Sequence, residues 1–253
     1  MLRSLNELLG YELMAKDGQM GNVHDFFFSD EDWTVRYLVV DTGPWIFGRK
    51  LLIDPQALLQ PVWKSETFPV NLTREEVKAS PDLDLARPVS RLYEEKLRKH
   101  YNWPIYWGTA QAIPGHALYI PPNLITSQDV SDELDDEERT HLRSANELVN
   151  YRVMATDGEA GRLIDFIIED ETWQIRYMVV DAASSELDTD KQVLVALEWI
   201  RQIDVSSQTA ALDLHQDAIK YSPSFDPTLP VNRQQEEVLY DYHGRPKYWQ
   251  IVR

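Results

Sequence analysis

The sequence predicts a mainly β fold with short helices, in which two small β-barrels follow one another and each is followed by a C-terminal helix. Three observations predict it. The segment WTVRYLVVD at residues 33–41 recurs 140 positions later as WQIRYMVVD at 173–181. Both copies carry a D-G-x-x-G turn shortly before that segment, and its glycines supply the positive φ that a hairpin turn needs. Five to six short strands within about 70 residues favour a small barrel over an open sheet.

The repeat also predicts how the chain is divided into domains. The first copy begins LRSLNELLGYEL at Leu2 and the second begins LRSANELVNYRV at Leu142. The match extends to PVSRLYEEKLRKHYNWPIYW and PVNRQQEEVLYDYHGRPKYW, so one architecture satisfies both halves. We expect a first repeat with its helix at 1–107, an extended acidic linker at 108–140, and a second repeat with its helix at 141–253.

Each repeat opens with a short helix, because Ser4 with Glu7 and Ser144 with Glu147 have the spacing of a capping box. Segments rich in β-branched and aromatic residues then predict a hairpin followed by a meander. The expected strands of the first repeat cover residues 12–15, 22–28, 33–40, 50–53, 58–62 and 68–71. Later strands of the second repeat are expected at 192–197, 200–205 and 209–213.

Two further helices are expected in the first repeat. Thr73 with Glu76 forms another capping box, and the helix that it starts ends before Pro81. A longer helix has Ser90 as its candidate N-cap, and we expect it to lie across its own barrel or to dock on the other one. Its predicted apolar face consists of Val89, Leu92, Tyr93, Leu97 and Tyr101.

Composition limits the classes of function. The formal net charge is -17, from 42 acidic and 25 basic residues, so the chain repels nucleic-acid phosphates and anionic lipids, and we expect no direct nucleic-acid binding. The absence of cysteine excludes disulfides and thiolate chemistry and suits a reducing compartment. No run of about 18 apolar residues occurs. We therefore expect a cytoplasmic protein without a transmembrane segment.

A family resemblance adds to this prediction. The SLNELLGYEL entry, the D-G-x-x-G hairpin with an aspartate soon after, the RYLVVD strand, LIDPQAL and SPDLD together resemble the PRC-barrel family. This module is named after the cytoplasmic domain of the photosynthetic reaction-centre H subunit and also forms the C-terminal domain of RimM-type ribosome maturation factors. The resemblance covers about 2–84 and 142–226. It implies six-stranded barrels that serve as protein-binding platforms and implies no catalytic residues.

The aspartates shared by both copies have two interpretations. Asp25 with Asp41, and Asp165 with Asp181, would supply paired carboxylates for acid/base chemistry. Alternatively they accept amide hydrogens at strand ends, with Arg36 pairing with Asp25 or with another strand. We favour the structural interpretation. The histidines lack metal-site spacing and no phosphate-binding loop is present, so the sequence predicts no catalytic residue, no metal and no cofactor.

Aromatic residues mark the candidate interaction surfaces. The motifs YNWPIYW and HGRPKYW end the two repeats and contribute Trp103, Tyr106, Trp107, Tyr248 and Trp249. These side chains either hold the C-terminal helix on its barrel or contact another molecule. The loop TGPWIFGRK of the first repeat has AASSELDTDK as its counterpart. Three consecutive apolar side chains at a hairpin tip need a packing partner in the second barrel, in a second copy or in another protein; they are Trp45, Ile46 and Phe47.

These patterns support several hypotheses about function. The first is a non-catalytic protein-binding or assembly module made of duplicated barrels, with an unknown protein partner and a homodimer as the expected assembly. A second is a carboxylate-dependent hydrolase that uses the aspartate pairs. A third is a factor in ribosome assembly or RNA processing, by analogy with the RimM-type proteins. The acidic run DVSDELDDEE at 129–138 favours a solvated segment over a loose Ca²⁺ site, because it lacks the spacing of a calcium-binding loop.

Overall fold

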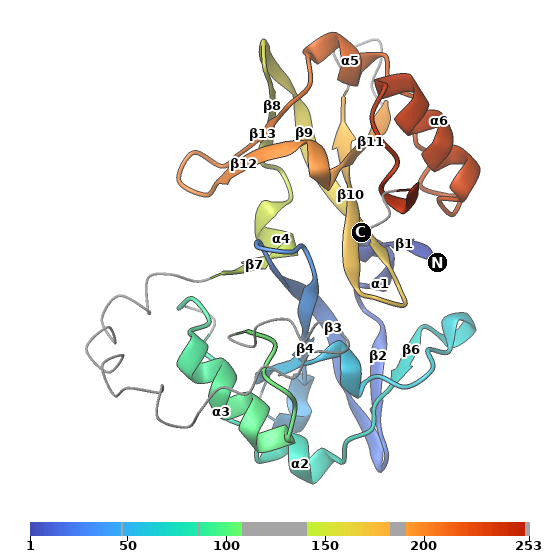
Figure 1. The fold of residues 1–253 in the computed structure, drawn as a ribbon. Helices are drawn as coiled ribbons and strands as arrows, with labels where there is room; N and C mark the ends of the chain where they lie inside the picture. The colour runs from blue at the N-terminus through green and yellow to red at the C-terminus, as the bar shows by residue number, and fades with distance from the viewer. Residues whose placement is uncertain (47, 85–86, 108–140, 183–190, 251–253) are drawn as a thin grey trace, which may run out of the picture.

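The part of the chain that the structure describes is mainly β, with two sheets and six short α-helices (Figure 1). The structure is a computed structural model that describes residues 1–46, 48–84, 87–107, 141–182 and 191–250. The predicted acidic linker at 108–140 therefore lies outside the described residues, and the domain boundaries at 107 and 141 stay predictions. None of the described helices is long and apolar enough to cross a membrane.

The two repeats contain matching elements, whose bounds are as follows. The first repeat comprises β1 (Leu2–Ser4), α1 (Leu5–Leu8), β2 (Glu12–Ala15), β3 (Gly18–Ser29), β4 (Val35–Asp41), β5 (Lys50–Ile53), β6 (Thr67–Pro69), α2 (Arg74–Lys78) and α3 (Arg91–Tyr101). The second comprises β7 (Leu142–Ser144), α4 (Ala145–Leu148), β8 (Arg152–Ala155), β9 (Gly158–Glu169), β10 (Gln174–Asp181), β11 (Gln192–Ala196), β12 (Ile200–Asp204), β13 (Thr209–Leu212), α5 (Gln216–Lys220) and α6 (Arg233–His243).

The two sheets repeat one strand order. The first runs β5-β4-β3-β2-β6 and the second β11-β10-β9-β8-β13-β12. Along both paths the neighbours are antiparallel except for β2 with β6 and β8 with β13, which are parallel. Among the described strands, no hydrogen-bonded pairing joins the two end strands of either sheet. The mainly β prediction is confirmed, and the expected strands at 12–15 and 50–53 have the observed bounds.

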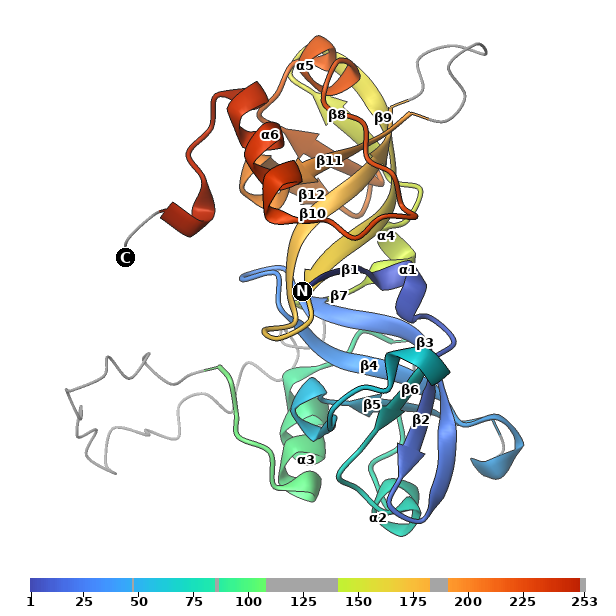
Figure 2. The same ribbon diagram turned by 90° about the vertical axis from the view of Figure 1, so that its right-hand side faces the viewer.

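The entry strand of each repeat pairs with the sheet of the other repeat (Figures 1 and 2). β1 lies antiparallel to β9, with Ser4 opposite Ile167. β7 lies in the same way on β3, with Ser144 opposite Phe27. The short helices α1 and α4 follow these strands and therefore also sit at the junction. Each half is thus completed by a segment of the other, as in a domain-swapped dimer contained in one chain.

The halves also share one hydrophobic core. Phe28 and Phe166, from β3 and β9, meet edge to face with ring centroids 5.5 Å apart. The ring centroid of Trp173 lies 6.1 Å from that of Phe68 in the opposite half, and the ring centroid of Trp33 lies 6.5 Å from that of Phe166. Such contacts remove large apolar areas from water on both sides of the junction at once. The packing therefore couples the stability of the two halves.

Two local predictions are wrong. The expected strand at 58–62 forms only isolated bridges, from Leu58 to Val70 and from Val62 to Thr67, and Pro61 has no amide hydrogen to donate to a ladder. Leu92 is 55% exposed rather than part of the buried face of α3. Val89 and Leu97 are buried as predicted, and the buried face also carries Glu94 and Arg98, which are 0% and 2% exposed.

Candidate functional site

The repeated aspartates Asp25 and Asp165 anchor the exchanged entry segments. Both are buried, at 7% and 9% exposure. Asp25 accepts hydrogen bonds from the Ser144 hydroxyl at 2.5 Å, from the Asn146 amide at 3.1 Å and from the Phe26 amide at 2.7 Å. Asp165 accepts the corresponding bonds from Ser4, Asn6 and Phe166. Each carboxylate thus satisfies one amide and one hydroxyl at the start of the other half's first helix, and one amide of its own strand.

Burial raises the pKa values of Asp25 and Asp165 above the ordinary value of an aspartate. Desolvation raises the pKa of Asp165 to about 6, against the lowering effect of the hydrogen bond from Ser4. Desolvation likewise raises the pKa of Asp25. Raised carboxylate pKa values occur in acid catalysts, but here every oxygen has a partner at the junction. The predicted acceptance of amide hydrogens by Asp25 is confirmed.

Asp41 belongs to a different environment from Asp25. It accepts a hydrogen bond from Lys50 Nζ at 2.8 Å and from the Gly43 amide at 2.8 Å. The hydrogen bond from Lys50 holds its pKa below the ordinary value. Asp25 and Asp41 therefore have separate partners rather than sharing a proton. Arg36 pairs with Asp32 instead of with Asp25 or another strand.

A buried glutamate on each C-terminal helix forms the second repeated cluster. Glu94 of α3 accepts a hydrogen bond from the Tyr37 hydroxyl at 3.0 Å and one from Tyr106 at 2.6 Å. The Tyr106 hydroxyl also lies 2.8 Å from Nε2 of His141, which itself lies 3.1 Å from Glu94 Oε1. Burial is the largest cause that raises the pKa values of Tyr37 and Tyr106, so both hydroxyls stay protonated donors. This cluster fixes α3 to β4 and fixes the C-terminal motif to both.

The second half repeats this arrangement with its own residues. Glu236 of α6 accepts hydrogen bonds from Tyr177 at 2.7 Å and from Tyr248 at 2.9 Å, and Arg233 lies 3.0 Å from its other oxygen. Sequence reasoning missed both glutamates, because Glu is rarely fully buried. The available signal was their identity in the aligned words LYEEKL and QQEEVL.

Tyr177→Phe tests how much this cluster contributes. The change removes one hydrogen bond to buried Glu236, which keeps Tyr248 and Arg233, so we expect the free energy of unfolding to fall by about 1–2 kcal/mol. Urea unfolding followed by circular dichroism measures it. Tyr221→Phe is the matched control, since Tyr221 is 62% exposed. Equal effects of the two changes would contradict a structural role for the cluster.

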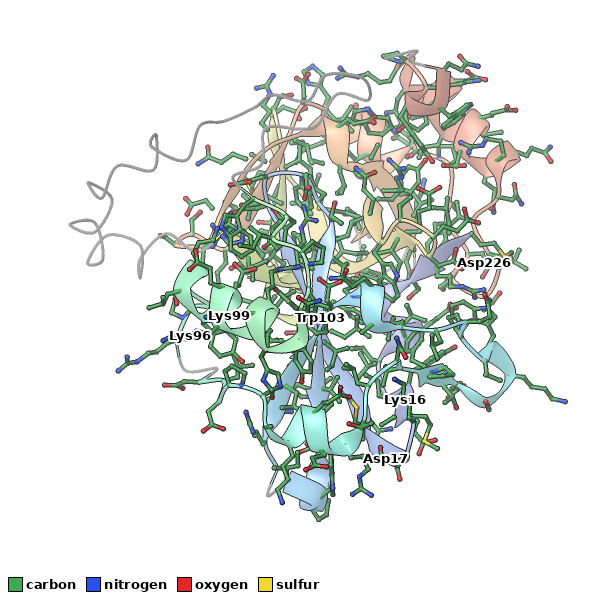
Figure 3. The ribbon with its side chains drawn as sticks, turned by 60° about the horizontal axis from the view of Figure 1, so that its bottom comes forward. Lys16, Asp17, Lys96, Lys99, Trp103 and Asp226 are labelled. Carbon is green, nitrogen blue, oxygen red and sulfur yellow. The ribbon has the colours of Figure 1, made fainter. Side chains whose placement is uncertain are left out.

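The aromatic residues of the C-terminal motifs pack partly within the chain. Trp103 is half-buried and stacks on Tyr101 with centroids 4.3 Å apart, and Figure 3 shows it beside α3, the helix that carries Lys96 and Lys99. Trp249 meets Tyr240 at 5.2 Å. Tyr106, Trp107, Tyr248 and Trp249 are also half-buried. These contacts within the chain agree with the interpretation that the motifs hold the C-terminal helices on the sheets. Contact of the same residues with another molecule stays a prediction.

The apolar loop of the first repeat also lies against its own half. Ile46 is buried at 9% exposure and belongs to the core. Trp45 is half-buried, and the guanidinium of Arg74 lies 4.3 Å from the centroid of its ring. Trp45 and Arg74 border a hollow of about 600 Å³, which is also lined by residues 19–24 and 41–44. Phe47 lies outside the described residues, and its role as an interaction residue stays a prediction.

A second hollow of about 600 Å³ lies where the halves meet, and we call it the junction groove. Arg98 lines it and is held by hydrogen bonds to Asp54 Oδ2 at 2.8 Å and to the Pro104 carbonyl at 2.5 Å. The groove is lined by residues 34–36, 54–56, 58–61 and 104–106 with Arg98 from the first half, and by the 170–173 turn of the second half. No sequence pattern pointed to it, since its walls come from separate segments.

The described residues contain no group of three or more histidine and carboxylate side chains placed to hold a metal ion. Comparison of the chain with known protein families and with curated proteins finds no match. We therefore infer the function from the sequence and the geometry of the chain.

Proposed function

We propose that the chain is a non-catalytic protein-binding or assembly module built from two PRC-type small β-barrels in tandem, each followed by a C-terminal helix. The matching strand orders of the two sheets support the duplicated barrel. The observation that carries the functional proposal is the use of the shared acids. Asp25 and Asp165 each accept three hydrogen bonds, two of them from the entry segment of the other half, which supports a structural use of these acids rather than a catalytic one.

Protein binding is further supported by exposed apolar side chains. Leu59 and Ile105, which line the same hollow, are 50% and 47% exposed, and apolar residues that gather at a surface mark interaction sites. The proposed protein is a cytoplasmic homodimer, in line with the absence of cysteine and the strongly acidic composition. The charge of -17 favours contacts with basic protein surfaces rather than with nucleic acid.

Sedimentation and affinity purification test this function. We expect the wild-type chain to sediment as a dimer and to retain at least one protein partner when purified with a tag. Trp45→Asp with Phe47→Asp is expected to leave the circular dichroism spectrum in place and to reduce the sedimenting mass or the recovery of the partner. A monomer that recovers no partner in both forms would overturn the proposal.

A further inference from the structure

The junction groove combines exposed apolar side chains with a preformed shape. Leu59 and Ile105 line it and are 50% and 47% exposed. Val62, next to the lining residue Pro61, is 47% exposed. Pro61 and Pro104 also line the groove and have no amide hydrogen to present to water. These side chains form an apolar patch in a groove whose other lining residues are mostly polar or charged.

The repeat provides an internal comparison for this surface. In the aligned second half, Arg201 occupies the place of Leu59 and Lys247 the place of Ile105. Arg201 pairs with Asp213 at 2.5 Å, and Lys247 pairs with Asp241 at 2.9 Å. The same backbone positions thus accept paired charges at the surface. The apolar side chains of the first half are not required by the architecture.

The walls of the groove are held in place before anything binds. The Val35 amide donates to the Trp173 carbonyl at 2.8 Å, and the Ile175 amide donates to the Trp33 carbonyl at 2.8 Å. These bonds fasten the turn of the second half to β4 of the first. A preformed groove loses little conformational entropy when a ligand binds.

Charge in the groove selects the partner. Asp54 is paired with Arg98 at 2.8 Å, and Asp170 is paired with Arg3 at 2.8 Å. Glu171 is exposed, and the described residues provide it with no ion pair. Glu171 lines the same groove as the apolar patch of Leu59 and Ile105. A cationic side chain of a ligand is the complementary group, and the net charge of -17 attracts it over a longer range.

We propose that the junction groove binds an extended segment of a partner protein that carries aliphatic residues next to a lysine or arginine. The aliphatic side chains cover Leu59 and Ile105, and the cation pairs with Glu171. This inference rests on the proposed function as a protein-binding module and names the chemistry of its partner. A groove of about 600 Å³ has the size of sites that take a few side chains.

Peptide selection tests the proposal. A random peptide library is selected on the full chain, and single peptides are resynthesised with a fluorophore and measured by anisotropy. We expect enriched peptides to combine aliphatic residues with lysine or arginine. Leu59→Arg with Ile105→Lys, which installs the residues of the second half, should weaken their binding at least about tenfold. Glu171→Gln should weaken it less and reduce its dependence on salt.

Matched variants separate the groove from other surfaces. Leu92→Lys changes a 55% exposed apolar residue of α3 outside the groove, and we expect it to leave peptide affinity unchanged. Arg201→Leu with Lys247→Ile changes the equivalent positions of the second half and should also leave it unchanged. Leu59→Arg with Ile105→Lys, Glu171→Gln and Leu92→Lys should keep the wild-type unfolding midpoint, because the substituted side chains are exposed. The Lys247 side chain is only 17% exposed and pairs with Asp241, so the unfolding midpoint of Arg201→Leu with Lys247→Ile is measured before its peptide affinity is compared.

Each contrary result has a defined meaning. Peptides that bind the groove variant as tightly as the wild type overturn the groove assignment and leave the binding function intact. Failure to enrich any peptide also overturns the groove assignment, whereas the sedimenting mass and the recovery of a partner test the binding function separately. Loss of dimer mass in the groove variant means that a second copy occupies the groove. Tighter peptide binding after Leu118, Tyr119 and Ile120 of the predicted linker at 108–140 are changed to serine means that this linker occupies the groove. Either of the last two results overturns the partner assignment.

Discussion

Gly21→Ala is expected to lower the free energy of unfolding by about 3 kcal/mol or more. A Cβ atom at Gly21 would lie 2.2 Å from the Asp41 carbonyl oxygen, a backbone atom of the neighbouring strand that cannot rotate away. Gly21 also has φ of 152°, which side chains of L-residues rarely adopt. The change therefore forces β3 and β4 apart beside the first hairpin. Gly161→Ala should have a similar effect, because its Cβ would lie 2.1 Å from the Asp181 carbonyl oxygen.

Gly43→Ala provides the control for this prediction. Gly43 has φ of 54°, and a Cβ atom added to it would have no heavy atom within 4 Å. Alanine at position 43 is therefore disfavoured only by its left-handed backbone conformation, which lowers the free energy of unfolding by about 1–2 kcal/mol. Urea unfolding of the two variants separates the steric cost from the conformational cost. Equal destabilisation by Gly21→Ala and Gly43→Ala would refute the close approach of the two strands.

The junction aspartates predict a stability that falls as pH rises from about 4 to about 6. Asp165 ionises near the ordinary aspartate pKa of 3.8 in the unfolded chain, whereas burial raises its pKa in the folded chain to about 6. The folded state therefore holds the proton more tightly, and its advantage is complete below the unfolded pKa and lost as pH rises through the folded pKa. A shift of this size corresponds to about 3 kcal/mol. Burial also raises the pKa of Asp25, so its ionisation likewise lowers the stability of the folded chain as pH rises.

Asp165→Asn isolates this contribution. The amide imitates the protonated carboxyl, since its oxygen accepts the backbone bonds from Asn6 and Phe166 while its nitrogen faces Ser4. We expect the variant to match the wild type near pH 4 and to exceed its stability by about 3 kcal/mol above pH 6.5. Urea unfolding across this range measures the difference.

Asp41→Asn serves as the comparison for the pH experiment. Lys50 lowers the pKa of Asp41, so its contribution has the opposite sign and is lost as pH falls through the folded pKa. This variant should keep the decline in stability that Asp165 causes between pH 4 and pH 6. A difference between the wild type and Asp165→Asn that does not change with pH would refute the assignment of that decline to Asp165.

Local sequence rules predicted the local elements. Ser4, Thr73 and Ser90 each accept the amide hydrogen that their capping pattern requires, because a cap depends only on residues within one turn. The hairpin glycines and the strands at 12–15 and 50–53 follow for the same reason. The helix face of α3 was predicted less well, because hydropathy assigns glutamate and arginine to the surface while Glu94 and Arg98 are buried with partners.

The sequence by itself determined that the chain contains one β architecture twice, with its caps, turns and most of its strands. Only the tertiary structure decided which strand each entry segment joins, because β1 carries the same side chains whether it pairs with β3 or with β9. The same non-local pairing buries Asp25 and Asp165 under the opposite half and assembles the junction groove from both. Residues far apart in the sequence make these features, so no local pattern records them.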